Sequence, residues 1–306
     1  MGKLVTDSNT FALYNFDEAD HNTQHQDSSA NQRHLTSSNI DATVVGGGPG
    51  NFALYMDRGG YAPNSRAGTT TAEKTTFWQG PWSISFWVQP HFTFMDGYDG
   101  GNACVVSYGA TDGNLRHCRV QVKSDGSWHY MRMGPGAGED MTLTANGSIN
   151  DMEWVHLAVT CESGTVSGAP SRTFRLYKNG TLDITSASHP QFSASNGTTP
   201  KWHVGTVQQG NFSYVQGGIA AMRISNKLRD ASEIQADYRQ GALDIQKYGS
   251  SKQYWQRVYD TGAGWCYYSS SLSASDNPLA AECTPNHTNN IVAGSYSLLY
   301  TTDKEN

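Results

Sequence analysis

Short segments with strand-like alternation run through most of this chain and constrain its fold more than any other feature. Each segment alternates apolar with polar residues or is rich in β-branched and aromatic residues, and clusters of turn-forming residues separate the segments. Helical periodicity is almost lacking before residue 230. Strands spaced in this way indicate an all-β sandwich. The segments are 11–16, 42–45, 52–56, 82–88, 103–109, 118–123, 128–133, 154–161, 173–179, 201–206 and 217–225.

Turn and cap residues support this interpretation. Asp125-Gly126 and Asn179-Gly180 stand between strand segments, where two-residue hairpins require positive φ. Asp230 and Glu233 have the spacing of a helix capping box, and Gly241 can end that helix. We therefore predict an all-β, two-sheet antiparallel sandwich with one short closing helix that runs from Asp230 to about Gly241.

The length of the chain indicates one large domain and an appendage. The chain has 306 residues, whereas sandwiches of about 200–250 residues often form one unit. Charged residues make up only 16% of the chain, and 8 Trp and 16 Tyr supply apolar area for a core. We predict a sandwich domain over residues 1–245 and an irregular C-terminal extension over residues 246–306.

The extension is too aromatic for a solvated tail. It is marginal in size for an independent core and shows no clear strand pattern, so its aromatic side chains need burial elsewhere. We predict that residues 246–306 form a docking or assembly element and that the protein is a homo-oligomer or part of a larger assembly. Cys266 and Cys283 lie in this segment and are a possible disulfide. The aromatic residues are Tyr254, Trp255, Trp265, Tyr267 and Tyr268.

Charge and hydropathy exclude two classes of partner. The net charge is −6, and the 21 basic residues are scattered singly, so no basic surface for nucleic acid is expected. No apolar run reaches the roughly 18–20 residues that a membrane-spanning helix needs, and the N-terminus shows no secretion signal. We expect neither nucleic-acid binding nor membrane insertion.

Seven motifs follow one another between residues 12 and 241. They are ALYNFDEAD (12–20), DSSANQRHL (27–35), FALYMDRGGYA (52–62), WSISFWVQP (82–90), WVHLAVT (154–160), RLYKNGTL (175–182) and GGIAAMRISNKLRDASEIQADY (217–238). Their order resembles the laminin-G-like jelly-roll domains of the concanavalin A-like lectin/glucanase superfamily. One departure is Arg58 after Asp57, where the family has Gly.

The resemblance implies a jelly roll that binds glycans or proteins on a concave face or on rim loops. It also implies a calcium site, for which Asp17, Asp27 and Asn31 are the candidate ligands. However, Ala220-Ala221 stands where the family has Asp-Glu, and the loss of two carboxylates argues against calcium. No other cofactor is expected.

Catalysis is not expected. The hydrolases that share this superfamily resemble one another through Glu-x-Asp-x-x-Glu on one strand, because a retaining mechanism needs two carboxylates about 5–5.5 Å apart. No strand segment here has that alternation. The acidic clusters at 17–20, 139–140 and 151–153 fall at strand ends or in loops, which predicts that the protein is not an enzyme.

Aromatic residues in long loops are the best candidates for carbohydrate binding. Sugars stack their apolar faces on aromatic rings, whereas polar side chains bind their hydroxyl groups. The candidates are Phe92, Phe94, Tyr98, Trp202, Phe212 and Tyr214.

These observations predict a non-catalytic, lectin-like recognition and structural module. We expect a virion component, made in the host cytoplasm, such as a bacteriophage capsid decoration, tail or fibre protein, because a lectin-like chain with no visible signal or anchor can leave a cell within a particle. Its partners would be cell-surface glycans or other virion proteins. The alternatives are an extracellular glycan-binding protein or adhesin, a purely structural subunit and, less favoured, a glycan-degrading enzyme.

Overall fold

The computed structural model divides the chain into two compact units, Met1–Asp244 and Ile245–Asn306. This boundary lies one residue before the predicted one. The residues that the structure describes are 4–17, 24–37, 42–46, 52–56, 67–69, 80–92, 102–109, 117–133, 141–190, 201–206, 215, 217–248, 255–260, 265–269 and 297–301.

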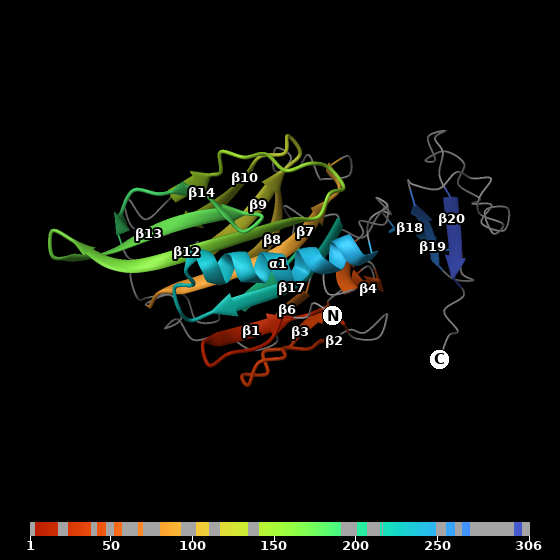
Figure 1. Ribbon diagram of the computed structural model, residues 1–306, viewed down its shortest axis with the longest axis horizontal. Coiled ribbons are helices and arrows are strands. Elements are labelled where there is room, and N and C mark those ends of the chain that lie inside the picture. The colour runs from red at the N-terminus through yellow and green to blue at the C-terminus, as the bar shows by residue number, and fades with distance from the viewer. Residues whose placement is uncertain are drawn as a thin grey trace. The chain divides into compact units, whose positions relative to one another are not determined.

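Two antiparallel sheets build the first unit (Figure 1). The nine-stranded sheet has the order β14-β13-β12-β7-β17-β5-β4, with β1 paired to β17 and β15 paired to β13. Its strands are β1 Thr10–Tyr14, β4 Ala42–Gly46, β5 Phe52–Met56, β7 Trp82–Pro90, β12 Val155–Val166, β13 Ala169–Lys178, β14 Thr181–Thr185, β15 His189–Pro190 and β17 Gly217–Ser225.

The second sheet is eight-stranded, with the order β11-β10-β9-β8-β16-β6-β3-β2. Its strands are β2 Gln24–His25, β3 Leu35–Ser37, β6 Ala67–Thr69, β8 Asn102–Gly109, β9 His117–Lys123, β10 Trp128–Met133, β11 Met141–Thr144 and β16 Lys201–Val204. All eleven predicted segments correspond to strands of the two sheets.

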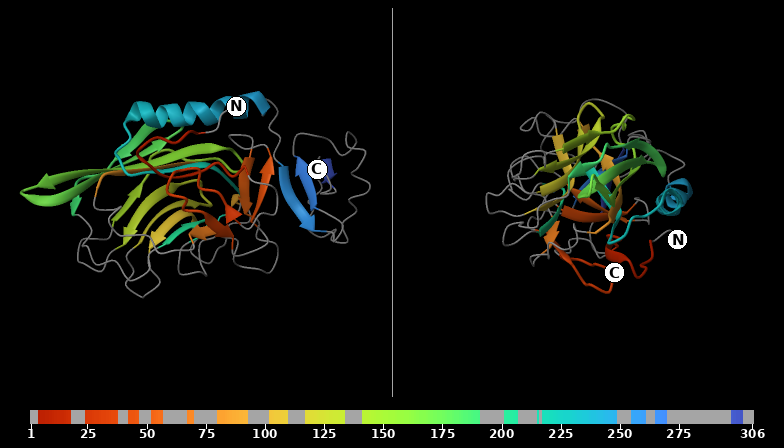
Figure 2. Two further views of the ribbon diagram at one scale, coloured as in Figure 1. Left: turned by 90° about the horizontal axis from the view of Figure 1, so that it is seen from below. Right: turned by 90° about the vertical axis from the view of Figure 1, so that its left-hand side faces the viewer.

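The facing sides of the sheets enclose one aromatic core. Trp82 lies 5.8 Å from Tyr130 and 6.1 Å from Phe174 between ring centroids, and all three side chains are buried. Aromatic pairs at such separations add to the stabilisation that burial provides. The left view of Figure 2 shows the helix α1, the nine-stranded sheet and the eight-stranded sheet as successive layers. The predicted two-sheet antiparallel sandwich is confirmed.

The two predicted hairpins differ in loop length. Asn179-Gly180 forms the expected two-residue loop, with both residues at positive φ. At Asp125-Gly126 the two-residue prediction is wrong, because Lys123 and Ser127 close a three-residue loop through a 2.8 Å backbone hydrogen bond. Only Gly126 has positive φ there. This is the common three-residue hairpin, in which a turn is followed by a residue in the left-handed region.

The closing helix α1 (Ala231–Tyr248) begins at the predicted capping box. The Asp230 carboxylate accepts a hydrogen bond from the Glu233 backbone N–H at 2.9 Å, and the Glu233 carboxylate accepts one from the Asp230 N–H at 3.2 Å. These contacts satisfy two backbone donors at the start of the helix.

The helix continues seven residues past Gly241, which was predicted to end it. A Cβ atom at Gly241 would lie 2.3 Å from Nε1 of the buried Trp87, so glycine is required there for close packing on β7. Trp87 also stacks on Tyr238 of α1, with ring centroids 5.5 Å apart. The glycine therefore marks a helix–sheet contact rather than a helix end.

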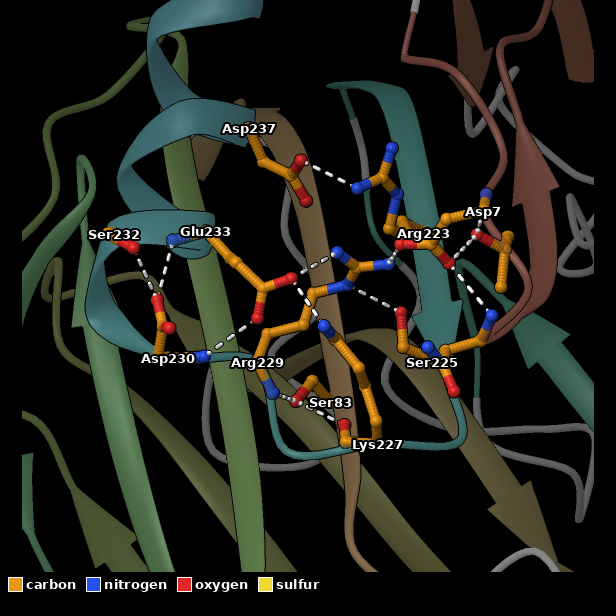
Figure 3. A network of polar contacts seen from close by, with 12 residues as sticks. Asp7, Ser83, Arg223, Ser225, Lys227, Arg229, Asp230, Ser232, Glu233 and Asp237 are labelled. Atoms are coloured by element: carbon orange, nitrogen blue, oxygen red, sulfur yellow. Dashed lines mark hydrogen bonds and ion pairs between the residues drawn. The ribbon is translucent and has the colours of Figure 1, made fainter.

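An arginine connects the N-terminal segment, the sheet and the helix (Figure 3). Arg229 donates hydrogen bonds from its guanidinium to Asp7 at 2.7 Å, to Ser225 at 2.7 Å and to Glu233 at 3.3 Å. Its backbone N–H also donates to the Ser83 hydroxyl at 2.8 Å. The Asp7 carboxylate is partly exposed. Its partial burial would raise its pKa, but hydrogen bonds from Arg229 and Thr10 outweigh that effect and lower the pKa to about 2.

A second arginine, Arg223 of β17, is almost completely buried. Arg223 donates to the Asp237 carboxylate of α1 at 2.8 Å, and the side chains are only 7% and 6% exposed. Its other terminal nitrogen donates to the Val5 carbonyl, and the Ser85 hydroxyl donates to Asp237. The two arginines thus fix α1 and the N-terminal segment to one face of the nine-stranded sheet.

Strands β12 and β13 continue beyond their neighbours as a two-stranded ribbon. β12 pairs with β7 only as far as Cys161, whereas its pairing with β13 continues to Val166 and Ala169. Figures 1 and 2 show the tip of this ribbon extending past the ends of the adjacent strands. The sequence pattern predicted only the segments that are buried in the sheet.

The second unit contains a three-stranded antiparallel sheet of the order β18-β19-β20. A strand ladder was not predicted in residues 246–306, so the structure is more regular here than expected. The strands are β18 Trp255–Asp260, β19 Trp265–Ser269 and β20 Ser297–Thr301.

Candidate functional site

The candidate site is the side of the eight-stranded sheet that faces away from the core. In β9 the core residues Cys118, Val120 and Val122 alternate with Arg119 and Gln121, because successive side chains of a strand point to opposite faces. The same alternation places polar residues of β8, β10 and β16 on this side. We call this set the polar face; it consists of Ser107, Arg119, Gln121, His129 and His203.

Strand register brings these side chains together in two rows. Gln121 lies directly opposite His129, and Arg119 lies opposite Ser107, which in turn lies opposite His203. Side chains directly opposite one another in an antiparallel pair have Cβ atoms about 4.5–5.5 Å apart. The polar face is therefore a compact cluster rather than scattered surface residues.

A buried hydrogen bond joins the centre of the first row. His129 Nε2 lies 2.8 Å from Gln121 Oε1, and both side chains are buried. Gln121 is 1% exposed, and its Nε2 has no acceptor among the described residues. An unsatisfied buried donor costs about 1–3 kcal/mol, so this amide favours an external acceptor.

The second row adds a positive charge and another donor. Arg119 donates from Nη2 to the Met131 sulfur at 3.1 Å, which is a weak acceptor, and its buried Nε has no acceptor among the described residues. The Ser107 hydroxyl is occupied by the Thr206 carbonyl at 2.8 Å. The polar face therefore holds two buried N–H groups, one on Gln121 and one on Arg119, that no described residue satisfies.

Four adjacent strands of this sheet contain neither aspartate nor glutamate. They are β8, β9, β10 and β16, and their polar residues are amide, hydroxyl, imidazole or cationic groups. In the described part of the chain, no three of His, Cys, Asp and Glu come together as metal ligands would. The arrangement suits hydrogen bonding to neutral or anionic oxygens.

The aromatic residues predicted to bind carbohydrate do not gather into one described site. Trp202 is 1% exposed and packs in the core against Tyr108, at 5.0 Å between ring centroids, so its prediction as a sugar platform is wrong. Phe92 is half-buried against the core, and its N–H donates to Asp151 at 2.6 Å. The other four, Phe94, Tyr98, Phe212 and Tyr214, lie outside the described residues.

The residues considered for calcium do not fit such a site. Each Asp27 carboxylate oxygen accepts two hydrogen bonds, from the N–H groups of Leu13, Ser29 and Arg33 and the Ser29 hydroxyl. Asn31 turns its amide nitrogen toward the Phe11 carbonyl at 2.9 Å. The Asp27 carboxylate thus organises the loop after β2, while Asp17 is half-buried at the end of the segment after β1.

The cysteine prediction lies largely outside the described residues. Cys266 is in β19, but its side chain is not among those described, and neither is Cys283. Cys104, Cys118 and Cys161 are buried thiols. Burial raises the pKa of Cys161 to about 12, so it is an unreactive core residue.

The polar face was not predicted, because the residues that the sequence offered as ligand-binding candidates were aromatic residues in loops. The signal was present as alternation: Arg119 and Gln121 in β9, and His129 and Met131 in β10, occupy the positions between core residues. The pattern did not reveal the strand register that places Gln121 opposite His129. It also did not reveal that both side chains are buried.

The comparisons with known proteins concern the same sandwich. One protein-family model matches residues 63–235 of this chain. The family is described as the concanavalin A-like lectin/glucanases superfamily. That range covers more than half of the chain and includes strands from both sheets. A search of curated proteins finds no match.

Solved structures are similar to this chain at low sequence identity. The botulinum neurotoxin type G receptor binding domain is 17% identical, with 85% of this chain and 59% of that chain covered and a TM-score of 0.51. The receptor binding domain of botulinum neurotoxin D is 12% identical, with 76% and 52% covered and a TM-score of 0.50. Domain 4 of an extracellular arabinanase from Geobacillus stearothermophilus, solved with arabinotriose, is 17% identical, with 75% and 98% covered and a TM-score of 0.46.

The chain therefore spans between half and three fifths of the two neurotoxin domains. At these identities the likeness concerns the fold.

Within the described residues, no helix is both long and apolar enough to cross a membrane.

Proposed function

This chain belongs to the concanavalin A-like lectin/glucanase superfamily, and from that premise we propose that it is a non-catalytic glycan-binding module whose ligand site is the polar face. The observation that carries the proposal is the buried Gln121 amide. Its oxygen is engaged by His129, while its nitrogen has no acceptor among the described residues. A sugar hydroxyl or carboxylate oxygen supplies such an acceptor.

The chemistry of the neighbouring side chains supports a glycan as the ligand. Arg119 adds a second buried donor and a positive charge, which suits an acidic sugar as well as a neutral one. Receptor binding is also the role named for the two neurotoxin domains that share this fold.

The composition of the polar face supports a binding role without turnover. Glycosidases flank the scissile bond with two carboxylates, about 5–5.5 Å apart in retaining enzymes and about 6.5–9.5 Å apart in inverting ones. Strands β8, β9, β10 and β16 supply no carboxylate to this face. Incubation with each bound glycan should leave it intact by mass spectrometry, and release of a shorter glycan would contradict this part of the proposal.

Replacing Gln121 by methionine should weaken glycan binding about tenfold. Gln121→Met keeps the approximate shape of the side chain but removes the whole amide, both the Nε2 donor and the oxygen that contacts His129. One hydrogen bond to the ligand is worth roughly 1.4 kcal/mol. A glycan array identifies the ligand, and calorimetry of its best glycan gives the affinity of each protein.

The matched control for this test is Gln235→Met on the helix α1, which covers the other sheet. It should leave the affinity unchanged. Equal affinities for the wild type and Gln121→Met, with both proteins folded, would contradict the site. An array without any binding would contradict the function itself.

We also propose a more specific setting, in which the module is a component of a virus particle, most simply of a bacteriophage. A module that is built into a particle needs contact surfaces besides its ligand site. The projecting β12–β13 ribbon and the aromatic-rich second unit are candidates for such surfaces. Genes for capsid or tail proteins beside this gene, and the chain in purified particles, would support the setting; its absence from such particles would contradict it.

Residues 246–306 are proposed as an assembly element within that setting. Their three-stranded sheet carries Trp255, Trp265, Tyr267 and Tyr268, residue types that are favoured as interface anchors. A chain that ends at Tyr248, after the whole of α1, should form smaller assemblies in sedimentation velocity. An unchanged assembly size and an unchanged thermal midpoint would contradict the assembly role.

A further inference from the structure

The outer part of the β12–β13 ribbon is exposed along both strands. Every residue from Ser163 to Pro170 is exposed, and Val166 at the tip is 52% exposed. Ser167 and Gly168 form the turn, both with positive φ, as in a two-residue hairpin of type I′. The ribbon thus presents two strand edges that no other described strand covers at the tip.

The turn fixes which backbone groups point outward on the β12 edge. A two-residue turn closes on a hydrogen-bonded pair, here Val166 and Ala169, so Gly164 and Val166 direct their N–H and C=O groups toward β13. The N–H and C=O groups of Ser163 and Thr165 therefore point away from the ribbon. The same alternation of backbone groups holds deeper in the sheet, where the carbonyl of His156, also an even-numbered residue of β12, accepts a hydrogen bond from the Asn179 N–H on the β13 side.

The two edges of the ribbon differ in how they are protected. On the β13 edge, Pro170 occupies the outward position and has no N–H to offer, and β15 then pairs with Ser171 and Arg172. On the β12 edge, the sequence Glu162-Ser-Gly-Thr-Val166 carries no proline, no lysine and no bulge. Such an unprotected edge is a template for another strand.

We propose that this edge pairs with the same edge of a second copy, about a twofold axis at Gly164. In that register Ser163 lies opposite Thr165 of the other copy, and the two such pairs form four backbone hydrogen bonds. Gly164 then lies opposite its own counterpart in a non-hydrogen-bonded pair, where Cα atoms approach to about 4.5 Å. The contact is isologous and closes as a dimer.

Side chains are compatible with this pairing. Glu162 would lie opposite Val166 of the other copy, so no like charges meet. The Glu162 carboxylate is already neutralised within its own chain by Arg175 at 2.7 Å. The exposed Val166 would cover the aliphatic part of the partner's glutamate. This self-complementarity favours a second copy over an unrelated strand.

The expected dimer is weak. A five-residue strand pair buries far less than the roughly 1,200–2,000 Å² of a stable interface, so we expect a Kd of roughly 10 µM to 1 mM. Dimerisation would join two glycan sites and raise the avidity for a multivalent surface, if the proposed function holds. The pairing itself does not depend on that function.

Proline at position 165 tests the pairing in the full chain. Thr165→Pro removes an N–H that points outward, so the ribbon keeps its internal hydrogen bonds while the dimer loses two. It should raise the dimer Kd at least about tenfold in sedimentation equilibrium, with an unchanged thermal midpoint. The control Thr165→Val keeps the N–H and should dimerise like the wild type.

Cysteine cross-linking tests the register independently. Under a twofold at Gly164, Gly164→Cys places two thiols at a Cα separation within the roughly 4.4–6.8 Å range of disulfides, whereas Thr165→Cys does not. A Cβ at Gly164 has room, since its nearest neighbour is Ser171 Oγ at 3.4 Å. Oxidation should give a reducible dimer for Gly164→Cys only.

Three results would overturn the proposal. One is a wild-type chain that stays monomeric at millimolar concentration. Another is equal cross-linking of Gly164→Cys and Thr165→Cys. The third is association that persists unchanged in Thr165→Pro, which would place the contact elsewhere, such as in residues 246–306.

Discussion

Replacing Asp237 by alanine is expected to lower the free energy of unfolding by about 3–5 kcal/mol. The Asp237–Arg223 ion pair is enclosed between α1 and β17, with side chains 6% and 7% exposed. Burial raises the pKa of Asp237 and lowers that of Arg223, so each charge is costly without the other. Removing one member leaves an uncompensated buried charge, which accounts for the size of the loss. Urea unfolding followed by tryptophan fluorescence measures it.

The matched control replaces both members of the pair with apolar residues of similar volume. The double variant Arg223→Met with Asp237→Leu should be less than half as destabilised, because no buried charge remains. It still loses the Arg223 hydrogen bond to the Val5 carbonyl. Equal losses for Asp237→Ala and the double variant would show that the pair contributes packing rather than charge neutralisation.

Acid should destabilise the protein through His156. This side chain is buried between Trp87 and Tyr238, with ring centroids 5.4 and 6.0 Å away, and burial lowers its pKa to about 3 from an ordinary value of 6.5. Below pH 6.5 the unfolded chain therefore binds a proton that the folded chain does not. Stability is lost as the pH falls from 6.5 toward 3, and the loss reaches about 2 kcal/mol at pH 5.

The variant His156→Gln isolates this contribution, since glutamine stays neutral at every pH. Between pH 7.5 and pH 5, its free energy of unfolding should fall by about 2 kcal/mol less than that of the wild type. His91, whose pKa burial also lowers, is present in both proteins and cancels in the difference. Parallel curves for the two proteins would refute the assignment to His156.

The fold was predictable from the sequence because its signals are local. Three of these signals each depend on only a few neighbouring residues: the alternation in the strands, the Asn179-Gly180 loop and the Asp230 capping box. The structure confirms all three. Gly241 was misread because the reason for that glycine is a tertiary contact with Trp87. The ribbon tip was missed because exposed strand residues carry no apolar alternation.

The candidate site was less predictable because it depends on strand register and on burial, which single residues do not reveal. Tryptophan is a residue type on which sugars stack, but the position of Trp202 in β16 directs its side chain into the core. Gln121 and His129 belong to different strands, and only their register makes them one site. Asp27 resembles a metal ligand in sequence, whereas its carboxylate accepts hydrogen bonds from three backbone N–H groups and the Ser29 hydroxyl, which a motif does not reveal.

The most direct test of the glycan-binding account is the side-chain amide signal of Gln121 in ¹⁵N-labelled protein during titration with the best array glycan. If the ligand accepts a hydrogen bond from Gln121 Nε2, that signal should shift in proportion to occupancy, together with those of Arg119 and His129. Saturable binding that leaves all three signals in place would contradict the polar face as the ligand site.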